Sequence, residues 1–332
     1  MLLKNIWRRL PQCFKKPAYW IKGWREQGRI VYKKESSYSY IQVIDKKGYR
    51  YLVFKDPSCP LHLQRPEDIY QSRMSLDDTL DTGVPYADYF HLAWIFNPQI
   101  KDIIMIGLGG AAVPKVFLKD YPEIFFRTVE IDPEVVNIAY KYFFLSQDDR
   151  HKIIIGDGRE YIKNTVDPAD LVLLDAFYSR TIPHHLFTVE FFQEIKNKLN
   201  EEGLLAINFN GSLAGTNSFL FSSVLKSLRT IFQQIYVFAS RKNSPNSMQN
   251  IIIFACKNLQ NLGRPEIIDL ARGLAEEKVT VSGFIFKARQ LYEGPVELEE
   301  AELIRDALSP PGGMINLYNS RIGKLIPETG EG

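Results

Sequence analysis

The chain of 332 residues is 45% hydrophobic and 13% aromatic, which is enough for one large or two ordinary globular domains with a substantial core. Its three cysteines are far apart and show no Cys-x-x-Cys or Cys/His spacing, which argues against a disulfide framework and a zinc site; they are Cys13, Cys59 and Cys256. We therefore expect no metal, and a reducing cytoplasm as the location.

The net charge of +2 conceals a basic first segment. Residues 1–34 carry ten Lys and Arg against one acid, Glu26, so the remainder holds 31 basic and 38 acidic residues. Trp7, Trp20 and Trp24 among these charges would suit contact with an anionic membrane surface, whereas a poorly ordered or docked leader over residues 1–28 is the plainer interpretation. No secretory core or membrane span is predicted, because charges interrupt residues 1–25 and polar residues interrupt 203–225.

A small β-rich domain is predicted over residues 29–97. Residues 29–45 alternate as a strand, the Lys-Lys-Gly at 46–48 predicts a hairpin turn, and residues 49–54 predict the returning strand. Residues 56–85 are rich in Pro, Asp and Ser and predict loop with short strands. The apolar spacing over 86–96 predicts a helix that ends at Asn97 and Pro98.

Residues 98–257 have the strand–helix alternation of a mostly parallel sheet that is covered on both faces. The predicted strands are 103–106, 125–131, 152–155, 171–174 and 204–208, with a closing antiparallel pair at 234–239 and 250–255. Predicted helices follow the glycine loop through 119 and the Asp132-Pro133 cap, and span 184–199 and 218–232. The remaining residues, 258–332, form a C-terminal extension with helices predicted over 265–276 and 298–307.

Glycine and acidic residues follow the predicted strands where a ligand would bind. The loop Gly107-Leu108-Gly109-Gly110-Ala111-Ala112 joins the first strand to its helix, so the backbone can approach a ligand there. Glu130 ends the second strand, where an acid can accept both hydroxyls of a ribose. The glycine loop and Glu130 would suit NAD and S-adenosyl nucleosides equally. The alternative role of Glu130 is a negative charge that is stabilised at the start of the next helix.

Two further acids narrow the choice of nucleoside. Asp157 ends the third strand, where an acid can accept the amino group of adenine or cap the next helix, and dinucleotide folds usually have no acid there. Asp175 ends the fourth strand near the topological switch point and can hold a substrate amine or the amino end of the nucleoside. His184 and His185 are interpreted as surface or capping residues rather than ligands.

These motifs together resemble the spermidine synthase superfamily, and most closely its divergent spermidine synthase-like branch. The resemblance runs from Arg29 to Lys257 and rests on GLGGAAVPKVF, VEIDPEVVNIAYKYF, GDGREYI and LLDAFYSRTIPHHLFTVEFF. It implies a methyltransferase-like Rossmann domain with a seven-stranded sheet behind a small N-terminal β-domain, and often a homodimer. It also implies decarboxylated S-adenosylmethionine, or S-adenosylmethionine itself, as co-substrate.

The resemblance also assigns roles to individual residues. Gly107 and Gly109 would face the nucleoside, and Glu130 would bind its ribose. Asp157 with Gly158 would bind the adenine. The resemblance places Asp175 at the substrate end; Tyr86 would line the amine pocket, and Gln71 would lie near the nucleoside tail.

Four positions depart from the family pattern. Where the family has the acid of its GGGDGG loop, this chain has Gly110. It has Tyr178 in place of the usual proton-accepting aspartate, and Ser39 in place of the glutamine of the first hairpin. The acid that the family has two residues after the pocket tyrosine, Tyr86, is present here only as Asp88. Tyr178 can bond to an amine, but with an ordinary pKa of about 10 it is a poor base.

Three functions stay open on this evidence. The first is aminopropyl transfer to a small-molecule amine, with Asp175 orienting the amine and Tyr86 and Tyr178 shaping the pocket. The second is methyl transfer from S-adenosylmethionine to a small acceptor, and the third is nucleoside binding without turnover. A dehydrogenase fits poorly, and no nucleic-acid partner is expected.

Overall fold

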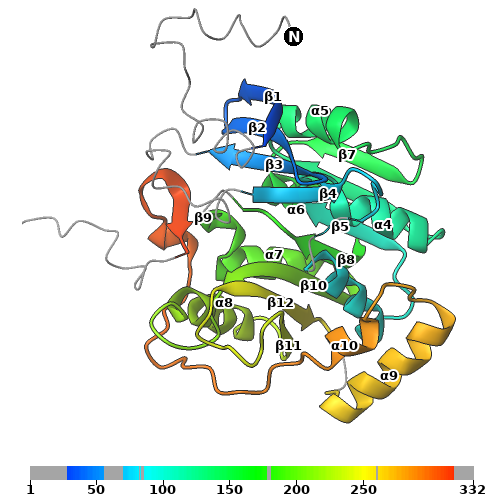
Figure 1. The fold of residues 1–332 in the computed structure, drawn as a ribbon. Helices are drawn as coiled ribbons and strands as arrows, with labels where there is room; N and C mark the ends of the chain where they lie inside the picture. The colour runs from blue at the N-terminus through cyan, green and yellow to red at the C-terminus, as the bar shows by residue number, and fades with distance from the viewer. Residues whose placement is uncertain are drawn as a thin grey trace, which may run out of the picture.

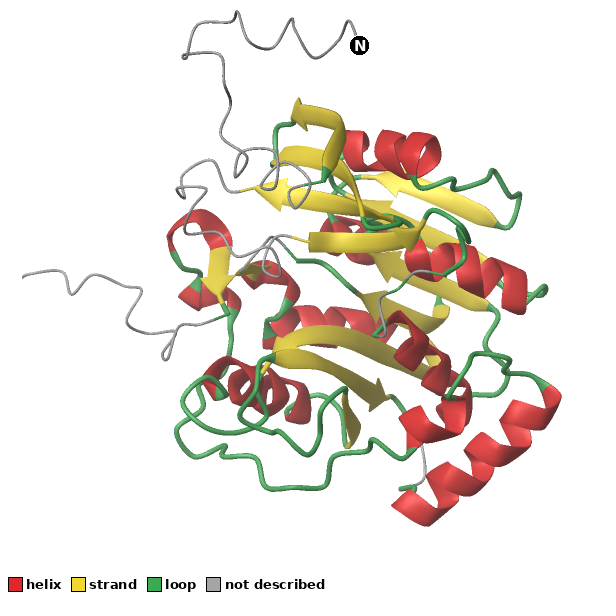
Figure 2. Cartoon of the chain, in the orientation of Figure 1, coloured by secondary structure: helices red, strands yellow, loops and turns green. Residues whose placement is uncertain are grey.

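A computed structural model describes residues 28–55, 70–81, 83, 86–177, 181–258 and 261–317. The basic leader and Tyr178 therefore lie outside the described residues. The model contains two main sheets, with helices on both faces of the larger one (Figures 1 and 2).

The small sheet is antiparallel and has the order β1-β2-β3-β4. Its strands are β1 (Arg29–Glu35), β2 (Tyr40–Lys46), β3 (Tyr49–Lys55) and β4 (Tyr70–Ser75). The predicted turn at 46–48 is confirmed, because Lys47 and Gly48 have φ of 51° and 78° and join paired strands. The strand pattern predicted over 29–45 is confirmed as two paired strands, β1 and β2, which are joined at the first hairpin that the resemblance implies over residues 35–38. The chain turns at Ser36, whose hydroxyl accepts the backbone N–H groups of Tyr38 and Ser39 and thereby separates β1 from β2.

The large sheet has seven strands, as expected, and only β12 runs against its neighbours. In spatial order they are β11 (Gln234–Ala239), β12 (Gln249–Cys256), β10 (Leu199–Gly211), β8 (Ala169–Leu174), β5 (Asp102–Ile106), β6 (Phe125–Glu130) and β7 (His151–Ile155). The chain enters at β5 in the middle and extends first to one side and then to the other. Such a switch point opens a crevice at the carboxyl ends of the strands.

Helices cover the large sheet because its side chains alternate between two apolar cores. On β5, Ile103 and Met105 belong to one core and Ile104 and Ile106 to the other. The first core is covered by η3 (Ala87–Leu92), α3 (Ala93–Phe96), α4 (Ala112–Asp120), α9 (Arg264–Glu277) and α10 (Phe284–Ala288). The second is covered by α6 (Gly158–Asn164), η4 (His184–Leu186), α7 (Val189–Lys198) and α8 (Phe219–Arg229).

The small sheet packs on the large domain through a third apolar cluster. Ile41, Val43 and Leu52 of the small sheet meet Ile138 and Phe143 at α5 (Pro133–Tyr142). Figure 1 shows β1 and β2 beside α5 at the β7 end of the large sheet. This packing places β4 over the glycine loop that follows β5.

Two predicted helices are wrong in extent. The helix expected over 184–199 begins at Val189, because the Thr188 hydroxyl caps it by accepting the Phe191 N–H, and His184–Leu186 is a separate turn. The helix expected over 298–307 is absent apart from η5 (Asp306–Leu308).

The segment before η5 is irregular rather than helical because it docks along α8. Ser223 and Ser227 of α8 accept the backbone N–H groups of Glu302 and Ile304, and the Lys226 ammonium donates to two backbone carbonyls of the segment. These bonds replace the ones that a helix would make within itself. Beyond η6 (Pro311–Gly313), the segment ends at β13 (Met314–Asn316), which pairs with β9 (Thr181–Pro183).

Candidate functional site

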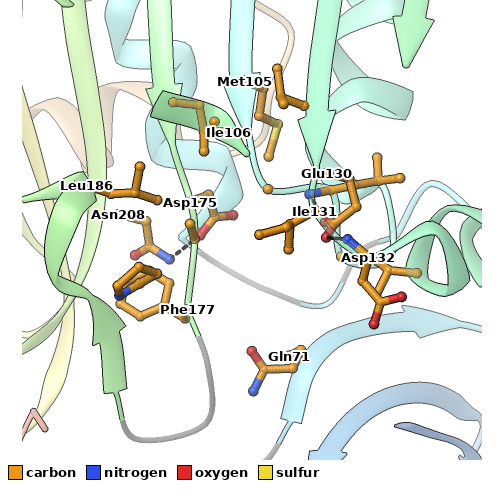
Figure 3. Close-up of a pocket in the computed structure, with 18 of the residues that line it drawn as sticks. Gln71, Met105, Ile106, Glu130, Ile131, Asp132, Asp175, Phe177, Leu186 and Asn208 are labelled. Carbon is orange, nitrogen blue, oxygen red and sulfur yellow. Dashed lines mark hydrogen bonds between the residues drawn. The ribbon is translucent and has the colours of Figure 1, made fainter. Parts of the chain in front are cut away.

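A cavity of about 520 Å³ lies at the carboxyl edge of the large sheet, beneath β4 of the small sheet. Among its lining residues are eight of the nine positions proposed from the sequence: Gln71, Tyr86, Gly107, Gly109, Glu130, Asp157, Gly158 and Asp175. Figure 3 shows Asp175 and Glu130 on strands that flank β5, with Gln71 across the space from them. The ninth, Tyr178, lies outside the described residues.

The glycine loop brings backbone, rather than side chains, to the cavity. Gly107 has φ of +94°, and a Cβ added there would lie 2.3 Å from the carbonyl oxygen of Asp175. A side chain at this position would therefore force β5 and β8 apart where their ends meet. Gly109 has φ of +53° and lies just below the Ser72 hydroxyl.

Gly110 faces packed protein where the family pattern has an acid. Its N–H donates to the Ser72 hydroxyl at 2.8 Å, and an added Cβ would lie 2.8 Å from a ring carbon of Phe143. The loop is thus bonded to β4, and no side chain fits at Gly110 without movement of Ser72 and Phe143.

Glu130 is buried at the end of β6, and both of its carboxylate oxygens accept backbone hydrogens. Oε2 accepts the Leu108 N–H at 2.9 Å and Oε1 accepts the Asp132 N–H at 3.0 Å. Burial raises the pKa of Glu130, and these backbone hydrogen bonds act in the opposite direction. The carboxylate is therefore fixed in place at the wall of the cavity, where it can accept a hydrogen bond from a ligand hydroxyl.

Asp157 caps α6 and also contacts a histidine. Its Oδ1 accepts the N–H groups of Arg159 and Glu160, and its Oδ2 lies 2.8 Å from His185 Nε2. The hydrogen bond from His185 is the main cause that lowers the pKa of Asp157. The interpretation as surface residues is wrong for His184, which is buried, whereas His185 is partly exposed and lines the cavity beside Asp157.

Asp175 is held by two neutral donors. The Tyr86 hydroxyl donates to Oδ2 at 3.0 Å and the Asn208 amide donates to Oδ1 at 2.9 Å, while Asn250 donates in turn to the Asn208 oxygen. Burial raises the pKa of Asp175, and the two hydrogen bonds lower it. Within the described part of the chain, no Lys, Arg or His forms an ion pair with this carboxylate.

Sequence reasoning missed three of these residues. Asn208 and Asn250 lie on adjacent strands and support Asp175, and Ser72 bonds the glycine loop. Asn208 could have been found from its place near the carboxyl end of β10, because the acids lie at the same edge of the sheet. Nothing local pointed to the other two, because their partners are 38 and 42 residues away in sequence.

Asp88 does not line the cavity, although we expected it to be, with Asp175, one of the two acids that remain to bind the substrate. It pairs with Lys287 of α10 at 3.2 Å and is not among the lining residues. Ser39 does line the cavity, and its buried hydroxyl has no hydrogen-bond partner within the described residues.

The cavity wall is acidic. It carries Glu130, Asp132, Asp157 and Asp175, and its described lining contains no Lys or Arg. Such a wall favours a cationic ligand. Over the described ranges, no three His, Cys, Asp or Glu side chains are grouped so as to hold a metal ion. Within the same residues, no helix has the length and apolarity needed to cross a bilayer.

Comparisons with known proteins agree with this architecture. A family model described as the spermine/spermidine synthase domain matches residues 87–263. A polyamine aminopropyltransferase of Vibrio vulnificus is 29% identical over 293 residues, covering 86% of this chain and 91% of the relative. The human eEF1A lysine and N-terminal methyltransferase is 27% identical over 233 residues, which cover 64% of this chain but only 32% of that protein. The crystal structure of a probable spermidine synthase from Corynebacterium glutamicum superimposes with a TM-score of 0.61 at 19% identity, covering 82% of this chain and 99% of that one.

Proposed function

The chain belongs to the spermine/spermidine synthase family, and from this premise we propose that it is a transferase that moves an aminopropyl group from decarboxylated S-adenosylmethionine to a small amine. The observation that carries the proposal is the carboxylate of Asp175. It is half-buried at the cavity wall, its described partners are neutral, and desolvation raises its pKa. A buried carboxylate is stabilised by a cation, and a protonated amine supplies one.

The lining residues take complementary roles in this proposal. Glu130 binds the ribose hydroxyls, and Asp157 with Gly158 receives the adenine. Gly107 and Gly109 present their backbone to the donor, and Gln71 lies at the tail of the nucleoside. The acidic wall supports binding of a sulfonium donor and an amine acceptor in one cavity.

The transfer step needs an amine with a free electron pair. The amine nitrogen attacks the carbon next to the sulfonium, the new C–N bond forms as the C–S bond breaks, and the sulfur leaves as a neutral thioether. An amine that arrives protonated must therefore lose one proton before it attacks, and the product can leave as a protonated secondary amine. In the proposal Asp175 orients the amine and accepts this proton, since a carboxylate with a raised pKa is the better base. Tyr86 and Tyr178 shape the acceptor pocket.

Methyl transfer from S-adenosylmethionine is the second candidate. It is favoured by Gly110, because the position that carries an acid in aminopropyltransferases has no room for a side chain here. Without that acid, a donor that retains its own carboxylate meets less repulsion. The methyltransferase relative, matched over about a third of its length, supports the same alternative.

Calorimetric titration with the two donors tests the proposal. Tighter binding of decarboxylated S-adenosylmethionine is expected, and a screen of amines for product formation would then identify the acceptor. Tighter binding of S-adenosylmethionine would instead favour methyl transfer. Binding without any turnover would indicate a nucleoside-binding protein, and binding of neither donor would refute the nucleoside assignment.

Tyr178→Asp restores the acid that the family usually has at this position. If aminopropyl transfer is the activity, a second carboxylate beside the amine should raise the transfer rate at least about tenfold, as general bases do. The rate of product formation at saturating donor measures this. A variant that binds donor as well as the wild type, yet shows no gain, would count against aminopropyl transfer.

A further inference from the structure

The contacts of Asp157 point to a role for the neighbouring histidine, and this inference rests on the proposed function. We propose that His185 is a positioning residue for the nucleoside base. It donates a hydrogen bond to one oxygen of Asp157 and leaves a single acceptor position, which selects a 6-amino purine over a 6-oxo purine.

The acceptor positions of Asp157 can be counted. An ionised carboxylate has about four lone-pair positions, two on each oxygen. Oδ1 accepts two backbone N–H groups at 2.9 and 3.0 Å, so its capacity is used by the start of α6. Among the described residues, Oδ2 has one partner, His185 Nε2 at 2.8 Å. One lone pair of Oδ2 therefore remains, on a residue that lines the cavity.

The direction of the histidine bond follows from the charge state of Asp157. The hydrogen bonds that Asp157 accepts lower its pKa, so at neutral pH it is ionised and carries no proton. His185 Nε2 must then be the donor, in either charge state of the imidazole. A carboxylate in this arrangement can only accept, so a group that approaches its remaining lone pair has to bring a hydrogen.

His185 is itself held in place by a buried arginine. Its backbone carbonyl accepts a hydrogen bond from Arg159 at 3.2 Å. The Arg159 guanidinium also bonds Glu194 of α7 and Asp306 of the C-terminal segment, with four contacts of 2.6–2.8 Å. The same arginine follows Asp157 by two residues in sequence. Asp157 and His185 are thereby both fixed to Arg159, so the two side chains need little further ordering when the ligand binds.

Selectivity follows from the chemistry of the base edge. The 6-amino group of adenine donates, and it can satisfy the free lone pair of Oδ2. The 6-oxo group of hypoxanthine presents an oxygen to the same carboxylate, which leaves both acceptors unpaired and repelling each other. Sites built around a hydrogen bond to the substrate discriminate more strongly than apolar pockets do.

The experiment compares S-adenosylhomocysteine with S-inosylhomocysteine, which differ in the group at position 6 of the base and in the hydrogen that hypoxanthine carries on the adjacent N1. Affinities are measured by calorimetry for the wild type, His185→Ala and His185→Gln, with Lys163→Ala on the exposed face of α6 as the matched control. The wild type is expected to prefer the adenine compound. His185→Ala should reduce this preference about tenfold, the loss of one charge-assisted hydrogen bond, and His185→Gln should retain most of it because its amide still donates.

The outcomes separate this inference from the proposed function. If His185→Ala lowers the melting temperature but leaves the ratio of the two affinities unchanged, His185 has only a structural role and the inference fails, while the proposed function stands. If His185→Ala strengthens adenosyl binding, the histidine competes with the base and the inference is also overturned. If the wild type binds neither compound, both the proposed function and this inference fail.

Discussion

Asp175→Asn is expected to lower the rate of group transfer about a thousandfold while the protein stays folded. The substitution removes the negative charge that binds the amine and the base that takes its proton, and general-base catalysis alone contributes about 10²–10⁴-fold. The asparagine amide still fits between Tyr86 and Asn208, which now contact the carboxylate at 3.0 and 2.9 Å. Turnover at saturating donor and amine measures the effect.

The pH dependence gives an independent check on Asp175. Because burial raises the pKa of this group above the ordinary value of about 4, the wild-type rate should fall as the pH drops through that raised pKa and the carboxylate becomes neutral. Asp175→Asn should lack this acidic limb. Asp269→Asn is the matched control, since this exposed aspartate on α9 pairs with Arg272 and does not line the cavity. A folded Asp175→Asn variant with the wild-type rate and pH profile would refute the assignment.

Glu130→Ala is expected to weaken binding of the S-adenosyl donor at least about a hundredfold. Two hydrogen bonds from the ribose hydroxyls to a carboxylate are lost, and each is worth about 1.5–3 kcal/mol. The backbone N–H groups of Leu108 and Asp132 also lose their acceptor, so the glycine loop is less well fixed. Calorimetric titration with S-adenosylhomocysteine measures the affinity.

A control and a milder variant distinguish ligand contact from loop disorder. Glu130→Gln keeps one acceptor oxygen and should lose only about tenfold in affinity. Glu123→Ala, at an exposed position before β6, should bind like the wild type. Unchanged affinity in Glu130→Ala would remove the ribose assignment, whatever happens to the melting temperature.

The local pattern of the chain predicts most of the large domain. Apolar runs that end in Gly or an acid predict β5, β6, β7 and β8, and the structure has all four within two residues of the predicted bounds. The antiparallel pair at the end of the sheet is also confirmed. These features depend on side-chain periodicity and on caps such as Asp132, which act over a few residues.

Elements whose conformation depends on distant partners were predicted less well. Residues 298–307 have a helix-like composition, but the serines of α8 accept two of their backbone hydrogens, so that most of the segment is not helical. Asp88 has the position of a substrate acid in the sequence, but α10 places Lys287 against it. In both cases a contact made across the fold outweighs a local preference.

The sequence by itself therefore determined the fold class and the row of residues along the sheet edge, because parallel strands bring their carboxyl ends to one side whatever their order. Only the tertiary structure decided the partners of each residue in that row. Asn208 and Tyr86 reach Asp175 from 33 and 89 residues away, and His185 reaches Asp157 from 28. Those partners set the charge state and the free lone pairs of the acids, and such long-range pairings have no counterpart in local periodicity.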